Sequence, residues 1–410
     1  MIPLIILLLV VAVISIRNFG RFKVEMWQAM ATGALLSIIL RQISIKDAIF
    51  SINFEIIFFL FFMFVIGSAF ELSGLLEFLS FKVFKNAKNV DTLILQMIFV
   101  FGILSSIFTN DTIAIVGTSL GLILSRNHKI SPKLILLTVA FSVTIGSTFS
   151  PIGNPQNLII AVLGKVPNPF VTFFKFNFIP MIVNLIFTYL ILKLFYKNEF
   201  HEEDLTHELV EIQDIKLAKI VSFSSIILII LILAKISIAY INPSYDFPLV
   251  YIAAISALPI IIFSNRRIEL IKEVDYKTLL FFISMFILMR SVFLSGIVQN
   301  TIKSLNLQEM GRISIFITSI LVSQLVSNVP AAILLLPFAD NSIQSLMALS
   351  SGTTIAGNLT ILGAASNIIA IQKSEKVGHT ITFWEFSKVG VALTLQNIIT
   401  YSVFYKVFLK

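Results

Sequence analysis

The segment TNDT (Thr109–Thr112) interrupts one long apolar run, and PIGNPQN (Pro151–Asn157) interrupts the next. The same order returns in the second half of the chain as SNVP (Ser327–Pro330) and LTILGAASN (Leu359–Asn367). Gly, Pro, Asn and Ser break helices, and at bilayer depth a broken backbone is tolerated only where it is buried in protein or lines a cavity. Finding this arrangement twice is typical of secondary transporters whose binding site lies between two repeats.

Composition assigns the chain to the polytopic membrane proteins. Of its 410 residues, 57% are hydrophobic and only 13% are charged, and the mean hydropathy is +0.96. A soluble protein of this length carries far more charge. The absence of Cys excludes thiolate catalysis, disulfides and Cys-based metal sites, and the four His residues lie in predicted loops without metal-ligand spacing. The net charge of +8 is spread over loops, so we expect the lipid bilayer and no nucleic acid as partner.

Apolar runs near the length needed to cross a bilayer occur five times in each half of the chain. Those of the first half are Ile2–Ile16, Val24–Leu40, Phe54–Gly74, Lys133–Gly164 (interrupted) and Phe170–Leu194. Those of the second half are Ala218–Ala239, Phe247–Phe263, Thr278–Gly296, Ser345–Ile371 (interrupted) and Phe386–Phe408. The basic residues Arg17, Arg21 and Lys23 follow the first run, which is the wrong order for a cleaved signal peptide, so that run is expected to be a span.

Each half also contains one run with a polar middle, 92–125 and 312–338, which we expect to form a re-entrant hairpin with two apolar arms. The first of these is also long enough for an ordinary span and a loop. A shift of 222 positions places Leu72–Gly74 on Leu294–Gly296 and keeps the polar clusters in order, which indicates an internal duplication. The predicted fold class is an all-α polytopic membrane protein with about ten transmembrane helices plus two re-entrant hairpins, in two inverted five-helix repeats.

The predicted repeats, 1–196 with the broken helix 133–164 and 218–410 with the broken helix 345–371, flank a charged cytoplasmic linker at 197–217. Five spans is an odd number, so the second repeat must enter from the opposite face. With the N-terminus outside, most basic residues fall in cytoplasmic loops, as the positive-inside rule expects. We therefore expect a plasma-membrane protein with both termini outside. The cytoplasmic loops then receive Arg17, Arg21, Lys23, Lys82, Lys85, Lys88, Arg126, Lys129, Lys133, Arg266, Arg267, Lys272, Lys277, Lys373 and Lys376, and the outer loops Arg41, Lys46, Lys165, Lys303 and Arg312.

The four polar clusters supply the candidate binding residues. A coupling cation at the midplane needs several oxygens held by backbone that is free of its own hydrogen bonds. Pro151 and Pro155 prevent a continuous helix, and Gly153 allows close approach of the backbone to an ion or substrate. The half-helices that follow the tips would present positive dipole ends to an anion. The predicted substrate- and ion-binding residues are Thr109, Asn110, Asp111, Thr112, Gly153, Asn154, Asn157, Ser327, Asn328, Thr360, Gly363 and Asn367, with sodium at Asn110, Asp111 and Asn328.

Two charged residues at bilayer depth each allow two interpretations. A carboxylate there costs about 2.5–3.5 kcal/mol on insertion scales, so Asp111 is a candidate to bind sodium or to carry a proton. It could also cap the following half-helix. Arg290, within Thr278–Gly296, is a candidate counter-charge to an anionic substrate, but it could also form a structural pair or extend to the interface. Apart from a coupling sodium ion or proton, no cofactor is expected.

At these residues the chain resembles the ion transporter superfamily. The strings TNDTIAIV with SPIGNPQNLII, and SNVPAAILLLPF with LTILGAASNIIAI, are similar to those of divalent anion/sodium symporters, citrate transporters, the arsenite efflux permease and a sodium/proton antiporter branch. The likeness covers nearly the whole chain, and GNPQN most resembles the anion-permease branch near the arsenite permease. The resemblance implies five-plus-five inverted repeats, hairpins from opposite faces and an elevator-like movement.

The hairpin tips depart from one branch of that superfamily. In the dicarboxylate symporters each tip carries a Ser-Asn-Thr motif that holds sodium and the substrate carboxylate. Here Asn110 and Asn328 match the motif, whereas Asp111 and Val329 replace its third residue. An added carboxylate repels an anion unless it is protonated or cation-bound, and a lost hydroxyl removes a carboxylate contact. An Asn-Asp tip is more similar to the arsenite and antiporter branches.

These observations predict a secondary active transporter, and not an enzyme, for a small anion: an inorganic oxyanion, an arsenite-like species or a di- or tricarboxylate. The expected partners are this anion, a coupling sodium ion or proton and the bilayer; a homodimer and an accessory ATPase subunit stay open. The alternative is a sodium/proton antiporter in which Asp111 exchanges the ions. An intramembrane enzyme is disfavoured because no two acids lie close together at bilayer depth and no His lies in a span, and a passive channel fits the repeats less well. The sequence contains no Gly-rich phosphate loop with Lys, so nothing in it indicates an ATP-driven pump.

Overall fold

The computed structural model describes the chain from residue 2 to residue 407, except residues 17, 20, 21, 201–210, 242–246, 298, 299, 301–310 and 341. Several sequence predictions therefore lie wholly or partly outside the described residues. They concern much of the linker 197–217, the last residue of the span Phe386–Phe408, and the basic residues Arg17, Arg21 and Lys303.

Helices make up nearly all of the described chain, which confirms the all-α class. A two-residue antiparallel ribbon, β1 (Asn18–Phe19) with β2 (Phe22–Lys23), joins the first two helices. The first half contains α1 (Ile2–Ile16), α2 (Met26–Ile39), α3 (Ile45–Ser51), α4 (Phe54–Ser73), α5 (Leu75–Phe84), α6 (Val90–Phe108), α7 (Asn110–Asn127), α8 (Pro132–Gly146), η1 (Ser147–Phe149), α9 (Pro155–Leu163), α10 (Pro169–Phe195) and η2 (Lys197–Glu199). The second half contains α11 (Ile215–Ile241), α12 (Leu249–Phe263), α13 (Arg267–Lys272), α14 (Tyr276–Leu294), α16 (Arg312–Val326), α17 (Asn328–Leu335), η3 (Leu336–Phe338), α18 (Ile343–Ile355), η4 (Ala356–Asn358), η5 (Ile361–Gly363), α19 (Ala365–Glu375) and α20 (Phe383–Val407).

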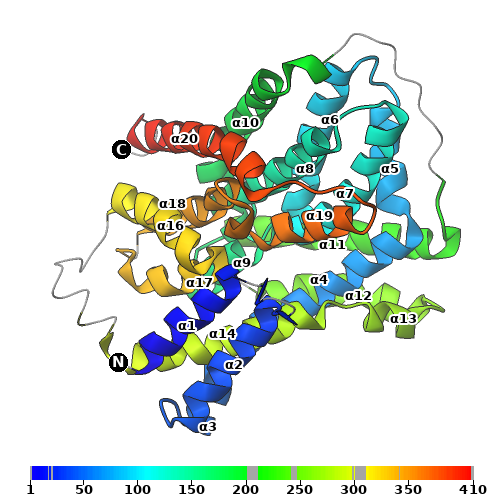
Figure 1. Cartoon of the computed structure of the whole chain (residues 1–410). Coiled ribbons are helices and arrows are strands. Elements are labelled where there is room, and N and C mark those ends of the chain that lie inside the picture. Colours follow the sequence, from blue (N-terminus) through cyan, green and yellow to red (C-terminus); the bar gives the residue numbers. More distant parts are fainter. Residues whose placement is uncertain are drawn as a thin grey trace.

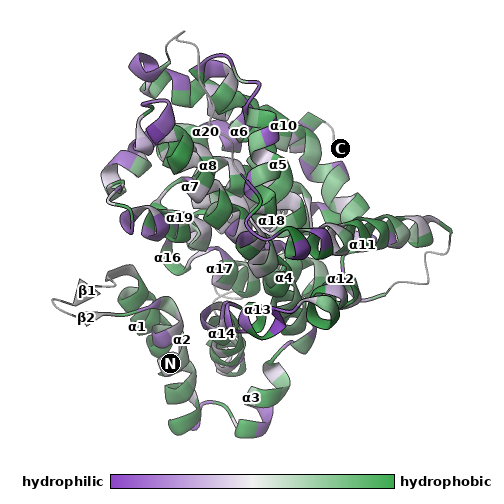
Figure 2. Cartoon of the chain, turned by 90° about the vertical axis from the view of Figure 1, so that its right-hand side faces the viewer, coloured by the Kyte–Doolittle hydropathy of each residue, from purple (hydrophilic) through white to green (hydrophobic). Residues whose placement is uncertain are grey.

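Six of the described helices are long and apolar enough to cross a membrane: α4, α6, α8 continued through η1, α10, α11 and α14. Shorter apolar helices include α1, α2, α12, α16 and α17 continued through η3. Hydrophobic residues predominate along the helices (Figure 2). The protein is therefore a multi-pass membrane protein by composition and fold. The total of ten spans and the re-entrant nature of α6–α7 and α16–α17 stay predictions of the sequence.

The helices pack as two bodies (Figure 1). In the first, named the scaffold here, α14 packs on α1 and α2, while α4 packs on α11 and α12. In the second, named the hairpin body, α8 packs on α6 and α7, α18 packs on α16 and α17, and α10 packs on α20. Within the scaffold, the third predicted span of each half thus lies against the first two spans of the other half. The two predicted repeats are intertwined in both bodies.

The helix breaks fall at the polar clusters. The chain passes from α6 to α7 at Thr109, with φ of 67° and ψ of 143°, and from α16 to α17 at Ser327, with φ of 73° and ψ of 164°. Positive φ is uncommon for residues other than Gly, so the two junctions share one unusual backbone geometry. After the break that follows α8, the Asn154 side chain caps α9 by accepting a hydrogen bond from the Asn157 N–H (2.8 Å).

Two glycines are required by close backbone approach at the broken helices. A Cβ added at Gly153 would lie 2.5 Å from the Ser147 carbonyl oxygen, and one added at Gly363 would lie 2.8 Å from the Ala356 carbonyl oxygen. Real Cβ atoms do not come so close to a backbone oxygen. Each glycine therefore lets its turn fold back on the short 3-10 helix that precedes it.

Candidate functional site

The breaks of both halves meet around one cavity. The second hairpin arms cross to the other half, because α7 packs on α19 and α17 packs on α9. Asn110 and Asp111 from the first tip, and Ser327 and Asn328 from the second, line a cavity of about 660 Å³. The N-termini of α9 and α19 line it as well. This volume is within the range of small-molecule sites, roughly 300–1,000 Å³.

The first tip is fixed to both halves by hydrogen bonds. The Asn110 N–H donates to the Gly153 carbonyl oxygen (2.7 Å), and Asn110 Nδ2 donates to Ser366 Oγ (3.2 Å) at the start of α19. Asn110 is 5% exposed, and its Oδ1 is buried with no hydrogen-bond partner among the described residues. A buried amide oxygen without a hydrogen bond costs free energy, so this atom is suited to accept a hydrogen bond from a ligand or to coordinate a cation.

The second tip presents the equivalent oxygen. Asn328 is 3% exposed, and its Oδ1 is also buried and unpartnered in the described part of the chain. The turn of the other broken segment of this half lies beside it, since a Cβ added at Gly357 would be 3.2 Å from Asn328 Nδ2. The two halves therefore bring matching amide oxygens to the edge of the same cavity.

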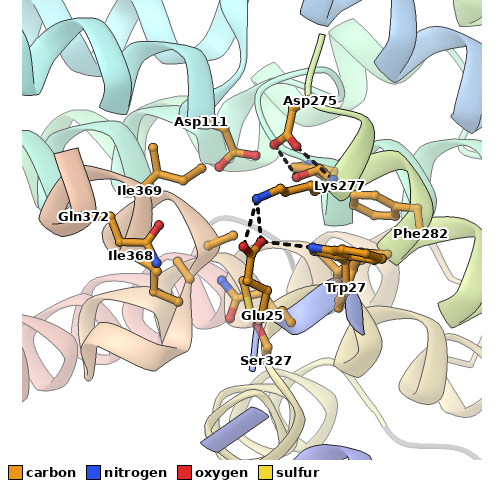
Figure 3. Close-up of a pocket in the computed structure, with 18 of the residues that line it drawn as sticks. Glu25, Trp27, Asp111, Asp275, Lys277, Phe282, Ser327, Ile368, Ile369 and Gln372 are labelled. Carbon is orange, nitrogen blue, oxygen red and sulfur yellow. Dashed lines mark hydrogen bonds and ion pairs between the residues drawn. The ribbon is translucent and has the colours of Figure 1, made fainter. Parts of the chain in front are cut away.

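Asp111 lies in the first turn of α7, is 8% exposed and lines the cavity. Its carboxylate faces the side of the cavity where Asp275 and Lys277 lie (Figure 3). No hydrogen bond or ion pair joins this carboxylate to another described residue, so it does not cap α7 through a hydrogen bond. It stays available to a cation or a proton, and its position near a helix N-terminus is electrostatically favourable.

The remaining wall comes from the scaffold and from the later residues of α19, including Ile368 and Gln372, and the sequence predicted none of it. Lys277 Nζ lies 2.8 Å from a Glu25 carboxylate oxygen, and Trp27 Nε1 donates to Glu25 (3.0 Å). Asp275 caps α14 by accepting from the Thr278 N–H (3.0 Å). These residues lie at the starts of α2 and α14 and surround the cavity mouth (Figure 3). One signal in the sequence could have indicated this pair. Glu25 and Lys277 have opposite charges and lie at the starts of two predicted spans, and the charge pattern assigns both starts to the cytoplasmic side.

Two predicted binding residues brace the broken helices. Asn157 Nδ2 donates to the Ser147 and Ser150 carbonyl oxygens (both 3.0 Å), and its Oδ1 accepts from Ser350 Oγ (2.8 Å) and Thr354 Oγ1 (3.2 Å) of α18. In the second half, Asn367 Nδ2 donates to the Gly357 carbonyl oxygen (2.6 Å). Asn367 Oδ1 is buried without a partner among the described residues. Asn157 thus links the two halves by hydrogen bonds, and it is not among the residues that line the cavity.

Several other predicted residues shape the turns. Thr109 Oγ1 lies 3.1 Å from Thr112 Oγ1, and Asn154 Nδ2 donates to Ser147 Oγ (2.8 Å). Thr360 Oγ1 donates to Gln324 Oε1 (3.0 Å) on α16, which holds the second broken segment against the second hairpin. None of these residues, nor Gly153 or Gly363, is among those that line the central cavity.

Arg290 lies away from the central cavity. It lines a separate cavity of about 280 Å³ near the opposite end of α14, together with Asp47 of α3. Because an α-helix rises 1.5 Å per residue, Lys277 and Arg290 are about 20 Å apart along the helix axis. In this conformation Arg290 is therefore not a counter-charge at the two hairpin tips.

A cation at the two hairpin tips would have the Asp111 carboxylate and otherwise neutral oxygens as ligands. The part of the chain that the structure describes contains no group of three or more His, Asp or Glu side chains that could hold a metal ion. Amide, hydroxyl and backbone carbonyl oxygens at the two tips, with the Asp111 carboxylate, are the ligands that a hard monovalent cation can use.

Comparison with known proteins identifies a family and related sequences. A family model described as citrate transporter matches residues 5–347. The 46 kDa membrane protein of Mycobacterium leprae is 23% identical over 403 residues, covering 92% of each chain. An uncharacterized transporter of Methanocaldococcus jannaschii is 27% identical over 379 residues, covering 91% of this chain and 95% of that one.

Two further comparisons concern a partial match and a fold. The silicon efflux transporter of Oryza sativa subsp. japonica is 36% identical over 134 residues, which cover 33% of this chain and 28% of that one. The crystal structure of the Alcanivorax borkumensis YdaH transporter is similar with a TM-score of 0.59 at 13% identity, covering 100% of this chain and 97% of that one. The latter is a likeness of fold.

Proposed function

Because this chain belongs to the citrate transporter family, whose members are membrane transporters of the ion transporter superfamily, we propose that it moves a small anion by secondary active transport. The anion is an inorganic oxyanion, an arsenite-like species or a di- or tricarboxylate, and the driving force is a sodium or proton gradient. The observation that carries the proposal is a pair of buried oxygens, Asn110 Oδ1 and Asn328 Oδ1, which have no hydrogen-bond partner among the described residues and lie beside one cavity that both halves line. The partial match to a silicon efflux transporter supports the inorganic alternative.

The two ligands of the proposed cycle need opposite features, and the cavity has both. Sodium would take oxygens at Asn110, Asp111 and Asn328, where it would also neutralise the Asp111 carboxylate. The anion would then approach the N-termini of α9 and α19, which line the same cavity and carry positive partial charge. Binding the cation first lowers the repulsion between Asp111 and the anion, which is a physical reason for coupling.

An elevator-like step would move the hairpin body along the scaffold. Such a movement must break the contacts between the two bodies, which include those of α17 with α14 and of α4 with α7 and α9. An ion pair joins Lys373 of α19 to Glu71 of α4 (2.7 Å), and a Cβ added at Gly67 of α4 would lie 2.8 Å from Thr112 Oγ1 of α7. The cavity mouth lies at the starts of α2 and α14, which the charge pattern assigns to the cytoplasm. In the proposed plasma-membrane orientation, with both termini outside, this conformation faces inward.

A sodium/proton antiporter is the alternative, and one observation favours it. The Asp111 carboxylate lines the cavity without a hydrogen bond to any described residue, and Asp275 lines the same cavity (Figure 3). A carboxylate near a second one can exchange a proton for a cation. In this alternative the cavity carries cations alone.

Purified protein in proteoliposomes separates these functions. We expect a sodium or proton gradient to drive uptake of one member of a panel of radiolabelled citrate, succinate, phosphate and arsenite, and Asp111→Asn to abolish it while leaving the protein folded. Wild-type uptake in Asp111→Asn, or no gradient-driven uptake of any anion, contradicts the proposal. Proton release driven by a sodium gradient in the absence of all four anions identifies the antiporter.

A further inference from the structure

The second cavity contains a cation at an apolar wall. Phe50 of α3 and Phe286, Met289 and Phe293 of α14 line it with Arg290. Arg290 is exposed and forms no ion pair with the described residues. Among the described lining residues, Asp47 alone has a carboxylate, and its Oδ2 accepts a hydrogen bond from Ser44 Oγ (2.6 Å) at the start of α3. The cavity therefore holds an unpaired positive charge and an acid already engaged at a helix N-terminus.

One side of α14 connects this cavity to the central one. Thr278 and Phe282 line the central cavity, and Phe286, Met289 and Phe293 line the second. Their spacing of four, four, three and four residues places all five on one side of the helix. The two cavities are therefore successive spaces along a single largely apolar helix face.

A single helix of the hairpin body lies between the two spaces. α17 packs on α14 (Figure 1). Val329 of α17 lines the central cavity, and Ile333, one turn further along the same face, lines the second. Both side chains are apolar, so neither forms a hydrogen bond that would oppose displacement of α17 along α14.

We propose that the second cavity is an antechamber for the transported anion on the face opposite the central cavity's mouth, in which the Arg290 guanidinium attracts the anion. This inference rests on the proposed function and extends it, because it assigns a binding role to a residue away from the hairpin tips. In the present conformation α17 separates the antechamber from the tips. Displacement of the hairpin body by about one helical turn, roughly 5.4 Å, would bring the tips to it.

The charge of the antechamber can be measured without any transport. The chain contains no Cys, so Ser51→Cys introduces a single thiol into the cavity lining. In intact cells, an anionic (sulfonatoethyl) and a cationic (trimethylammonioethyl) methanethiosulfonate are added from outside and their modification rates compared. Adding Arg290→Gln is expected to lower the anionic-to-cationic rate ratio about five- to tenfold, the effect of one nearby charge in a wet site. Arg290→Lys should preserve the ratio, and Lys165→Gln, a basic residue predicted elsewhere on that face, is the matched control.

The access route is tested by two thiols one turn apart. Ile333→Cys should react only with reagent added outside, and Val329→Cys only with reagent added inside. An unchanged rate ratio in Arg290→Gln, or an Ile333→Cys that is unreactive from outside in protein present at the cell surface, overturns the antechamber. Since neither measurement requires a transport cycle, these outcomes are independent of the anion panel, whose failure would overturn the proposed function.

Discussion

The two hairpin tips have the same backbone turn but are held differently. At the first tip, Asn110 donates one hydrogen bond to each half of the chain, to Gly153 and to Ser366. At the second, the Asn328 side chain forms no hydrogen bond within the described residues, and the next residue is Val329 where the first tip has Asp111. The arm that follows is also shorter, with 8 residues in α17 against 18 in α7.

This difference indicates a division of roles between the two tips, which the sequence predicts to be copies of one another. The first tip holds a charge at a position fixed by neighbours from both halves. The second offers a matching amide oxygen on a short arm that contacts the scaffold through apolar side chains. We therefore expect the first tip to define the ion site and the second to close over it.

The largest expected effect is the loss of transport when either amide oxygen is removed. Asn110→Ala and Asn328→Ala should each lower the uptake rate about 100-fold, since each removes a ligand that nothing else replaces. Only Asn110→Ala should also lower the apparent melting temperature of the ligand-free protein, because it loses the bond to Ser366, worth about 1 kcal/mol. Val329→Ala, which leaves both amides intact, is the control for uptake. Equal melting temperatures for the two Asn variants would show that the two Asn side chains stabilise their tips equally.

The next effect concerns the turns behind the tips. Gly153→Ala should destabilise the protein by about 3 kcal/mol and Gly363→Ala by about 1 kcal/mol, because overpacking costs more where the backbone must shift further. The added Cβ would lie 2.5 Å from a backbone oxygen at position 153 and 2.8 Å from one at position 363. Gly311→Ala has nothing within 4 Å and serves as the control. Chemical denaturation in detergent gives the ranking, and a reversed order would mean that the second turn is the more rigid one.

The local breaks of the fold could be predicted from the sequence. The junctions at Thr109 and Ser327 and the turns before α9 and α19 occur where Pro, Gly, Asn and Ser cluster, because those residues disfavour continuous helix through their own covalent structure. The resemblance of the chain to the ion transporter superfamily is confirmed by the family match over residues 5–347.

The tertiary parts of the site could not be predicted in this way. Glu25, Trp27 and Lys277 reach the cavity only because α2 and α14 pack together, and no local pattern encodes that contact. The sequence likewise predicted a ligand-binding role for Asn157, whereas its side-chain amide forms hydrogen bonds with Ser147, Ser150 and Ser350. A polar residue at bilayer depth indicates that its side chain has a hydrogen-bond partner or a ligand. Which of the two it has depends on tertiary packing, which the local sequence does not specify.

An effect smaller than that of Gly153→Ala lies in the connection between the first hairpin and the scaffold. The short helix α5 joins α4 to α6, and burial raises the pKa of its Glu77 carboxyl from the ordinary value of 4.5 to about 7, with the negative charge of Glu71 adding to the effect. Between these two pH values the folded protein therefore holds a proton that the unfolded chain has released. Stability should consequently fall as the pH rises through this window and level off above it.

Replacing Glu77 with Gln should remove that fall. Glu77→Gln and the wild type should have similar apparent melting temperatures at pH 5, whereas the variant should be the more stable by roughly 2 kcal/mol at pH 8, because the wild type must then ionise a largely buried carboxyl. Glu269→Gln is the control, since the hydrogen bond from Arg266 lowers the pKa of Glu269 and moves its titration away from this window. If Glu77→Gln keeps the wild-type dependence on pH, the stability of the first hairpin's connection to the scaffold is insensitive to this charge.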